Sequence, residues 1–569
     1  MKSQYQLFSK IIIIILIINA AIWLMSPIPD DGDSYLYANI VKELANSNHW
    51  YALTYNHQNW LDKPHFPFWI GAICFKLLGS NMISYNISGF IFYLIGGYFC
   101  YKLAQELYNK PIALTATIIY FSITRIAISA IYIRAEIFLL AELTAVAYYS
   151  WQYEHDHNIN LKHLFGLSLF SAMAIMTKGI FIVISIFGSI LILSIQQKQY
   201  CKLLSIKYLL SYLMIAILCS PEIIALYLQF DAHPHQNIQI LHQSYQNVSA
   251  IKWFFWDSQF GRFFNNSYIT HDIPVGGGYF YFIPIFLEFF LPWSLLFLLA
   301  IILPQRYQNN LTKSPTLLTK QFIFLISSFL ILFVLFSISK FQASLYIVIL
   351  FSFPAIIVAN SLHQYQETVL AKILQLQKIL LLLILSALPI ILFIITHNKA
   401  ITIAVALISS LAYYLTFLLQ SNLKQNFPKL MTVNVVIFML LYNGMMIIKN
   451  TFFIQHNIGR EIQQTLLLDN QYDSQQNFPI FYLNIDSGMV LNELLFHTNR
   501  SIKQLQAVDD IKNIDNLKFY LLIPTNQEQK ISTLFPTTAT MINRYQISRF
   551  HGFHKTEQQL ISLFRIYHE

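Results

Sequence analysis

Charged side chains from separate parts of the chain are the residues most able to do chemistry. Lysine and arginine neutralise a phosphate, and arginine can bind two of its oxygens at once. A nearby carboxylate can orient or deprotonate an incoming nucleophile. Because a charge beside a long apolar stretch is costly, such positions first suggest a functional role. The residues concerned are Asp31, Asp33, Asp62, Lys63, Arg134, Glu136, Lys178, Asp257, Arg262 and Lys340.

Lys178 is the sharpest of these positions. It lies in Met176-Thr177-Lys178-Gly179, a tight connection between two apolar stretches, where a charge would normally be avoided. Taken alone, any one of these residues is more simply explained as a helix end whose side chain reaches the interface, or as a solvated loop residue. The set as a whole favours a site that neutralises negative charge beside a lipid.

Membrane helices must position these residues. The 569 residues are 56% hydrophobic and 11% charged, with a mean hydropathy of +0.51, whereas soluble domains carry about 25% charged residues. A spanning helix needs about 20 apolar residues, and the sequence predicts thirteen, the first an uncleaved anchor. They cover roughly 10–26, 82–101, 111–130, 135–151, 163–176, 179–195, 208–228, 279–303, 321–338, 344–360, 376–396, 400–420 and 430–448.

The distribution of charge predicts the orientation. Short cytoplasmic loops are rich in Lys and Arg. With the N-terminus inside, the cytoplasmic connections hold 15 basic and 4 acidic residues. The opposite side of the membrane region, without the tail, holds 10 basic and 12 acidic residues. All the charged residues named above then fall on the outer face. This bias accounts for the net charge of +9, so nucleic-acid binding is not needed to explain it.

Three polar segments are predicted on the outer side: the loops 27–81 and 229–278, and the tail from 450. In the first, 34–45 places its apolar residues near one face, which predicts an amphipathic helix on the membrane surface. The tail alternates strand-like runs (480–485 and 519–523) with helix-like runs (489–496 and 527–534). We therefore predict a membrane domain over 1–450 and a small α/β domain over 451–569, on the periplasmic side in a bacterium.

A two-part motif in the first loop makes the chain resemble a known superfamily. Residues 33–38 (DSYLYA) place Tyr-Ala behind an aspartate at the head of the predicted helix. Trp50 follows, and thirteen residues later comes Lys63 of Asp-Lys-Pro, with aromatic residues behind it. The chain is similar in this respect to the lipid-linked membrane glycosyltransferases with the GT-C fold. It is most similar to the bacterial lipid A aminoarabinose transferases and the protein-mannosyltransferase-like group.

Later segments extend the resemblance over about residues 10–450. Glu136 stands where the family has a second acidic residue, more often Asp, and 176–179 resembles its Leu-Thr-Lys-Gly element. The segment 256–263 ends in a Gln-x-x-Arg-Phe-like pattern, and Leu291-Pro292-Trp293 fits the helix that follows. In 339–346 the family has Ser-x-Gly-Lys-Leu-Pro-x-Tyr, whereas this chain has SKFQASLY. Gln342 thus replaces the lysine, Lys340 is the candidate to supply the missing charge, and Tyr346 is retained.

The resemblance implies a role for each matched residue. Asp33, Lys63 and Glu136 would be catalytic, with Asp33 as the carboxylate and Lys63 beside the sugar or phosphate. Asp62 and Asp257 would orient their cationic neighbours, while Asp31 is read as a solvated loop residue. Glu142, Glu222 and Glu288 are expected to pair within the helix bundle. The carrier phosphate would be held by Lys178, Arg262, Tyr346 and Lys340.

An inverting transfer of a sugar from a polyprenyl-phosphate carrier is therefore the leading hypothesis. The acceptor is a lipid A phosphate or, alternatively, a protein Ser/Thr hydroxyl or another glycan. No cofactor is required by this chemistry. A divalent ion held by Asp62, Asp257 and Glu136 is a less favoured alternative, and zinc is disfavoured because three carboxylates without histidine ligands are not a typical zinc site. The alternatives from other classes are a lipid or glycan flippase and a scaffold protein. Against a flippase, the charges gather at one face and no repeat is visible.

Overall fold

The computed structural model shows two compact units, each built from separate stretches of the chain. The helical unit comprises 1–26, 48–53 and 59–447; the second unit comprises 27–47, 54–58 and 448–569. The structure describes residues 2–26, 33–233, 238–240, 243–264, 277–302, 319–396, 425–454, 458–469, 478–483, 488–498, 500–514, 518–551 and 554–567, with isolated positions at 403–423 and at 485. Among the residues and ranges named in the sequence analysis, Asp31 and most of the predicted span 400–420 lie outside this part.

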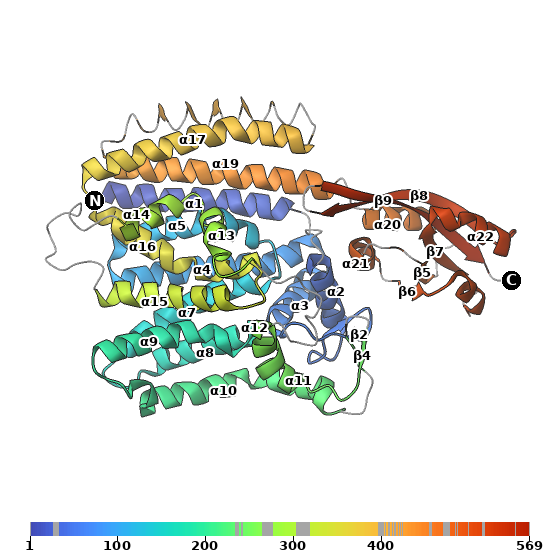
Figure 1. The fold of residues 1–569 in the computed structure, drawn as a ribbon, viewed down its shortest axis with the longest axis horizontal. Helices are drawn as coiled ribbons and strands as arrows, with labels where there is room; N and C mark the ends of the chain where they lie inside the picture. The colour runs from blue at the N-terminus through green and yellow to red at the C-terminus, as the bar shows by residue number, and fades with distance from the viewer. Residues whose placement is uncertain are drawn as a thin grey trace. The chain divides into compact units, whose positions relative to one another are not determined.

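The helical unit consists of apolar helices that follow most of the predicted spans (Figure 1). Their bounds are α1 Lys2–Met25, α3 Phe66–Leu78, α4 Met82–Leu107, α5 Lys110–Phe121, α6 Thr124–Ser129, α7 Ala135–His155, α8 Leu161–Lys178, α9 Ile184–Gln196, α10 Ile206–Leu226, α13 Phe282–Phe289, α14 Ser294–Ile302, α15 Lys320–Ile338, α16 Ser352–Gln364, α17 Glu367–Thr396 and α19 Asn426–Ile454.

Short elements connect these helices. They are η1 Ile180–Val183, η2 Lys202–Leu204, the π-helical η3 Tyr227–Asp231, strands β2 Gln58–Asn59, β3 Ile238–Ile240 and β4 Gln243–Tyr245, α11 Ala250–Lys252, the π-helical η4 Trp253–Gly261, α12 Arg262–Phe264 and η7 Ser344–Leu350. The helices pack on one another, and their partners are not always the next helix in the chain. Helix α7 contacts both α4 and α8, and α8 contacts α10.

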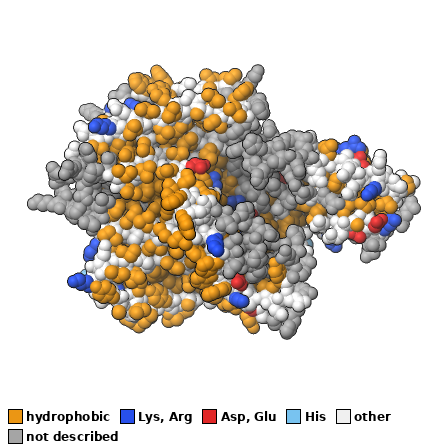
Figure 2. All heavy atoms as spheres, in the orientation of Figure 1, with side chains coloured by type: hydrophobic (Ala, Val, Ile, Leu, Met, Phe, Trp, Pro, Cys, Tyr) orange, Lys and Arg blue, Asp and Glu red, His pale blue; other side chains and the backbone are white. Residues whose placement is uncertain are grey.

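Five described helices are long and apolar enough to cross a membrane, and seven spans result if two bent pairs each count as one. Hydrophobic side chains cover most of the visible face of the helical unit (Figure 2), as expected for a surface in contact with lipid. The chain is therefore a multi-pass membrane protein. The predicted number of thirteen spans stays a prediction.

Three predicted spans are interrupted. The span predicted at 111–130 is divided into α5 and α6 at Ser122, whose hydroxyl bonds back to the carbonyl of Ile119. The span predicted at 279–303 is bent by 116° between α13 and α14, where Pro292 cannot donate a helical hydrogen bond. The one predicted at 344–360 is bent by 51° between η7 and α16. The sequence analysis missed α3, a 13-residue apolar helix inside the loop read as polar.

The second unit contains a mixed five-stranded sheet in the order β6-β5-β7-β9-β8, in which β6, β5 and β7 are parallel and the rest is antiparallel. Its elements are α2 Asp33–Asn46, β1 Thr54–Tyr55, α20 Ile458–Asp469, β5 Ile480–Leu483, α21 Gly488–His497, β6 Ile502–Leu505, η9 Val508–Asn513, β7 Lys518–Pro524, η10 Thr525–Gln527, α22 Glu528–Leu534, β8 Ala539–His551 and β9 His554–Tyr567.

The central strand β7 is apolar along its length because both of its faces are covered. Tyr520 and Leu522 join a core with α20 and α21, while Phe519 and Leu521 join a second core with α22. The first-loop helix α2 belongs to this unit and packs on α21, where Tyr35 contacts Phe496 edge-on. The sequence analysis predicted this helix on the membrane surface, but in the structure it has a protein partner.

Candidate active site

A cavity of about 260 Å³ lies within the helical unit. Most of its wall is apolar and comes from η1 and α9, η4, and the end of α15. Among the lining residues are two cations distant in sequence, Lys63 and Lys178, together with Asp62 and Tyr346. An apolar pocket with a few polar groups can hold a ligand that has a hydrocarbon part and an anionic part.

Lys178 is the last residue of α8 and is held between an acid and an aromatic ring. Its Nζ lies 2.9 Å from Oε1 of Glu136, in the first turn of α7, and 3.6 Å from the centre of the Tyr346 ring. Both charged side chains are only 11% exposed. A cation at a helix C-terminus and an acid at a helix N-terminus are each stabilised by the helix dipole. The two contacts therefore hold the ammonium group of Lys178 at the cavity.

Gly179 makes the tight connection after Lys178 possible. Its φ of 115° is one that side chains rarely adopt, and a Cβ placed there would lie 1.9 Å from Nε2 of Gln259. Gln259 uses this space to donate from Nε2 to the carbonyl of Lys178, 3.2 Å away, at the end of α8. Sequence reasoning placed Gly179 and Gln259 in two separate motifs but did not predict that the two residues meet.

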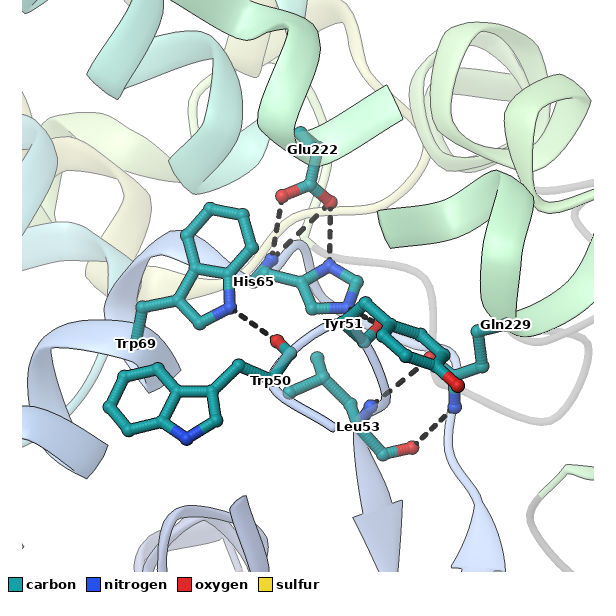
Figure 3. A network of polar contacts seen from close by, with 7 residues as sticks. All are labelled: Trp50, Tyr51, Leu53, His65, Trp69, Glu222 and Gln229. Carbon is teal, nitrogen blue, oxygen red and sulfur yellow. Dashed lines mark hydrogen bonds and ion pairs between the residues drawn. The ribbon is translucent and has the colours of Figure 1, made fainter. Parts of the chain in front are cut away.

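Lys63 lies just before α3 and forms an ion pair with its neighbour Asp62. Their side chains are 26% and 18% exposed, so both reach the cavity but remain partly shielded. The residues that lead to Lys63 form what we call the first-loop arm, defined as 48–53 and 59–65. This arm is tied to α10 and η3 by side-chain hydrogen bonds (Figure 3).

The bonds of the first-loop arm involve side chains that the sequence analysis did not assign to the site. Glu222 of α10 accepts hydrogen bonds from the backbone N–H of His65, and its Oε1 lies 3.0 Å from Nδ1 of the same residue. Gln229 of η3 bonds to both the N–H and the C=O of Leu53. The expectation that Glu222 pairs within the bundle is confirmed. Its partner, 157 residues away, carries no local sequence signal.

Comparisons with known proteins match part of the sequence and the fold. Residues 62–224 match the family model described as dolichyl-phosphate-mannose-protein mannosyltransferase. The crystal structure of ArnT from Cupriavidus metallidurans bound to undecaprenyl phosphate superposes with a TM-score of 0.71 at 14% identity, over 99% of this chain and 98% of that one. Its apo form gives the same TM-score at 15% identity. The chain therefore shares the fold of this ArnT structure.

The sequence relatives compared with this chain share one kind of name. The undecaprenyl phosphate-alpha-4-amino-4-deoxy-L-arabinose arabinosyl transferase of Wigglesworthia glossinidia brevipalpis is 23% identical over 371 residues, covering 64% of this chain and 60% of that protein. The protein of the same name from Shewanella sediminis is 28% identical over 151 residues, 26% of this chain and 27% of that one. The chain thus spans 60% of the length of the first relative and less of the second.

The segment 339–346 contributes to the cavity in part. Ser339, Phe341 and Tyr346 line it. The side chain of Gln342 instead donates to backbone carbonyls, among them that of Ser337 at 3.0 Å, near the end of α15. Lys340 is exposed, and its backbone N–H donates to the carbonyl of Phe263. The structure therefore brings Tyr346 to Lys178, and it keeps the side chain of Gln342 engaged with the backbone.

The remaining predicted residues are placed as follows. Asp33 is exposed in the first turn of α2 and belongs to the second unit. Asp257 is half-buried in η4, next to cavity-lining Ser258. Arg262 begins α12, and its side chain lies outside the described part of the structure. The catalytic role of Asp33 and the phosphate-binding role of Arg262 stay predictions.

The other acidic residues in the helices differ in their surroundings. Glu142 is fully buried and accepts a hydrogen bond from the hydroxyl of Thr177, which confirms a partner within the bundle. Glu288 is exposed at the end of α13. Within the described residues, no three His, Cys, Asp or Glu side chains are grouped as metal ligands. Among the described side chains, the charged groups at the cavity are Lys63 and Lys178 with their carboxylate partners, Asp62 and Glu136.

Proposed function

We propose that the chain is a glycosyltransferase that moves a sugar from a polyprenyl-phosphate carrier to a lipid A phosphate. The observation that supports this most directly is the cavity itself, where Lys63 and Lys178 lie among apolar walls. An isoprenoid chain suits the walls, and a phosphate suits the two cations. The names of the relatives and the undecaprenyl phosphate bound in the matching ArnT structure agree with this substrate class.

The proposed step is an inverting displacement. An oxygen of the acceptor phosphate attacks the anomeric carbon from the face opposite the carrier, and the bond from that carbon to the carrier phosphate oxygen breaks. Because the leaving group departs as an anion, Lys178 and Lys63 stabilise it without a proton donor. Tyr346 and Lys340, with Arg262 as the second phosphate ligand, complete this role in the proposal. Asp33 and Glu136 orient the acceptor and the donor.

A second acceptor is favoured by one specific observation. The matching family model describes transferases that act on proteins, over 62–224. A Ser or Thr hydroxyl must lose a proton as it attacks, so Asp33 would then act as a general base. A lipid A phosphate is already ionised and needs no base. The two acceptors therefore differ in what they require of Asp33.

The proposed location is the inner membrane of a bacterium, as a multi-pass protein with a cytoplasmic N-terminus. The transfer would take place on the periplasmic side, where the charge distribution of the loops also puts the tail. A cysteine introduced at exposed Asp509 and labelled with a membrane-impermeant maleimide in intact spheroplasts tests this arrangement. Labelling only after lysis would contradict it.

The test uses the full-length chain in lipid nanodiscs, with the sugar donor and labelled lipid A. Asp33→Asn should abolish transfer while undecaprenyl phosphate still binds, and Asp509→Asn, an exposed residue of the second unit, should behave as wild type. Transfer at the wild-type rate by Asp33→Asn would disprove the catalytic assignment. Donor lipid crossing the membrane without sugar transfer would instead support a flippase.

A deletion strain separates the acceptors. Mass spectrometry of lipid A and of envelope glycoproteins should show a changed mass of lipid A and unchanged glycoproteins. The reverse result would replace lipid A by a protein acceptor.

A further inference from the structure

We propose that His65 and Glu222 are positioning residues for Lys63. They fix the first-loop arm to α10 and so hold the ammonium group of Lys63 at the cavity. The inference rests on the proposed function for the identity of the ligand, a polyprenyl phosphate. Its structural part, that the pair orders the arm, does not depend on that function.

Glu222 forms the centre of the attachment (Figure 3). Its side chain is fully buried, and an isolated buried carboxylate is expensive unless hydrogen bonds compensate its desolvation. Oε2 accepts from the backbone N–H of His65 at 3.0 Å, and Oε1 lies 3.0 Å from Nδ1. Since α3 begins at Phe66, this N–H is next to the helix start, where a negative charge is also favourable.

His65 links Glu222 to the earlier half of the arm. Its Nε2 lies 3.0 Å from the carbonyl oxygen of Tyr51, which can only accept, so Nε2 carries a hydrogen. The ring also packs on Trp69 at 5.3 Å, and the indole N–H of Trp69 donates to the carbonyl of Trp50 at 2.8 Å. The side chain is 1% exposed. The ring thus ties α10 to the residues just after Trp50.

Gln229 provides a second attachment about two helical turns beyond Glu222. Its amide accepts from the N–H of Leu53 at 3.1 Å and donates to the C=O of Leu53 at 2.8 Å, as a neighbouring strand would. It also donates to Oδ1 of Asn59 at 3.1 Å. The two stretches of the arm, 48–53 and 59–65, are therefore both attached to one helix and its π-helical extension.

This anchoring restricts the position of Lys63. Only Pro64, whose φ is fixed by its ring, separates it from His65. Asp62, Lys63 and Pro64 all line the cavity, so the anchored residue directly follows the lining ones. A displacement of the reacting groups by about 1 Å can cost a hundredfold in rate. The buried pair therefore limits how far Lys63 can move from the phosphate.

The hydrogen-bond pattern predicts which substitutions are tolerated. In Glu222→Gln, the amide oxygen can accept from the His65 N–H, while the amide NH₂ donates to Nδ1 and Nε2–H still donates to Tyr51. All partners are satisfied, so kcat/KM for the donor should stay within about threefold of wild type, as expected when only one positioning bond is altered. Glu222→Leu removes both bonds and should lower kcat/KM at least about tenfold, equivalent to about 1.4 kcal/mol.

The test combines kinetics with hydrogen exchange on the full-length chain in nanodiscs. In Glu222→Leu, backbone amides of 48–53 and 59–65 should exchange faster than in wild type, while those of α15 are unchanged. Lys63→Met alone should reduce kcat/KM, and adding Glu222→Leu to it should cause little further loss, because the pair acts through Lys63. Losses that multiply, or Glu222→Gln as damaging as Glu222→Leu, would overturn the proposal.

His363→Leu is the matched control. It also replaces a polar side chain, in this case a partly buried one, by leucine and breaks a hydrogen bond, of 2.8 Å to Thr115, in the same unit. Exchange of the arm should not change in this variant, whereas faster exchange there would mean that any loss of packing loosens the arm. If the wild-type chain transfers no sugar, binding of undecaprenyl phosphate replaces kcat/KM as the readout. Altered exchange with absent transfer would then reject the proposed function but keep the positioning role.

Discussion

An ion pair between Lys178 and Glu136 joins the end of α8 to the start of α7, with Nζ and Oε1 2.9 Å apart. Each helix end stabilises the charge that it carries. The ion pair therefore needs no ligand to be stable, and in the proposed transferase the carrier phosphate would compete with Glu136 for Lys178. In the proposed transferase, Glu136 holds the lysine in place before the donor binds.

Replacing Lys178 by Met should leave the carboxylate of Glu136 buried without its main partner. We expect the free energy of unfolding to fall by about 3–5 kcal/mol and transfer to fall at least about a hundredfold. In the double variant Lys178→Met, Glu136→Gln the stability should recover, but the transfer should not. Thermal unfolding and initial rates of transfer measure the two effects. Recovery of activity along with stability would show that Lys178 is only structural.

The pair Lys202–Glu154 offers a control for this prediction. It joins η2 to the opposite end of α7, and Glu154 is only 4% exposed. Lys202→Met should reduce stability without specific loss of donor affinity.

Tyr346 should act on Lys178 through its ring. The ring centre lies 3.6 Å from Nζ, and a desolvated cation–π contact is worth about 2 kcal/mol. Tyr346→Phe keeps the ring and should retain most of the donor affinity, whereas Tyr346→Leu should weaken it by about 10- to 30-fold, the equivalent of 1.4–2 kcal/mol. Titration with undecaprenyl phosphate measures this affinity. If Phe is as damaging as Leu, the hydroxyl group rather than the ring is what matters.

Gly179→Ala should destabilise the connection between α8 and η1. A positive φ costs a non-glycine residue about 1–3 kcal/mol, and the new Cβ would also displace the amide of Gln259. Gly188→Ala, where a Cβ would meet only the tip of Ile331, should be close to neutral. Differential scanning calorimetry of the two variants compares them, and equal melting temperatures would contradict the role of Gly179.

The stability of the second unit should depend on pH in the acid range through Glu528. Two hydrogen bonds from Arg544, at 2.6 and 2.8 Å, lower the pKa of this carboxyl below its ordinary value of 4.5. Its contribution is therefore present above pH 4.5 and is lost as the pH falls through the lower folded-state pKa. Because Arg544 is half exposed, we expect the carboxylate of Glu528 to contribute less than about 1 kcal/mol to the free energy of unfolding.

Hydrogen exchange of β8, corrected for intrinsic rates, checks this dependence between pH 7 and pH 3. The acid-induced increase should be smaller in Glu528→Gln, which has no titrating group. An increase identical to that of the wild type would assign the acid sensitivity to other carboxyls.

Sequence reasoning found those site residues that carry charge in unusual places. Lys178 could be identified because a lysine between two apolar stretches is costly, and Lys63 because its motif is specific. Their meeting at one cavity could be expected only from the predicted outer-face location. Tyr346 came from the family pattern, and its contact with Lys178 is visible only in the folded chain.

The supporting residues could not be found in this way. His65 and Glu222 are 157 positions apart, and neither has a local motif. Glu222 was expected to pair because it is a carboxylate in the predicted span 208–228, but the sequence does not say with which residue. Likewise the apolar face of α2 predicts burial without saying whether lipid or protein covers it.

The composition of the second unit has a consequence for how the chain is made. Asn39 of α2 donates to the carbonyl of Asn492, 453 residues later in the sequence. In the same way, the ammonium group of Lys42 bonds to the carbonyl of Phe496. During synthesis the helix α2 must therefore wait for nearly the whole chain before its partner exists, while the intervening helices enter the membrane. A ribosome-bound chain truncated before α21 should expose the apolar side of α2 to chaperones, and quality control can detect an incomplete product by that exposure.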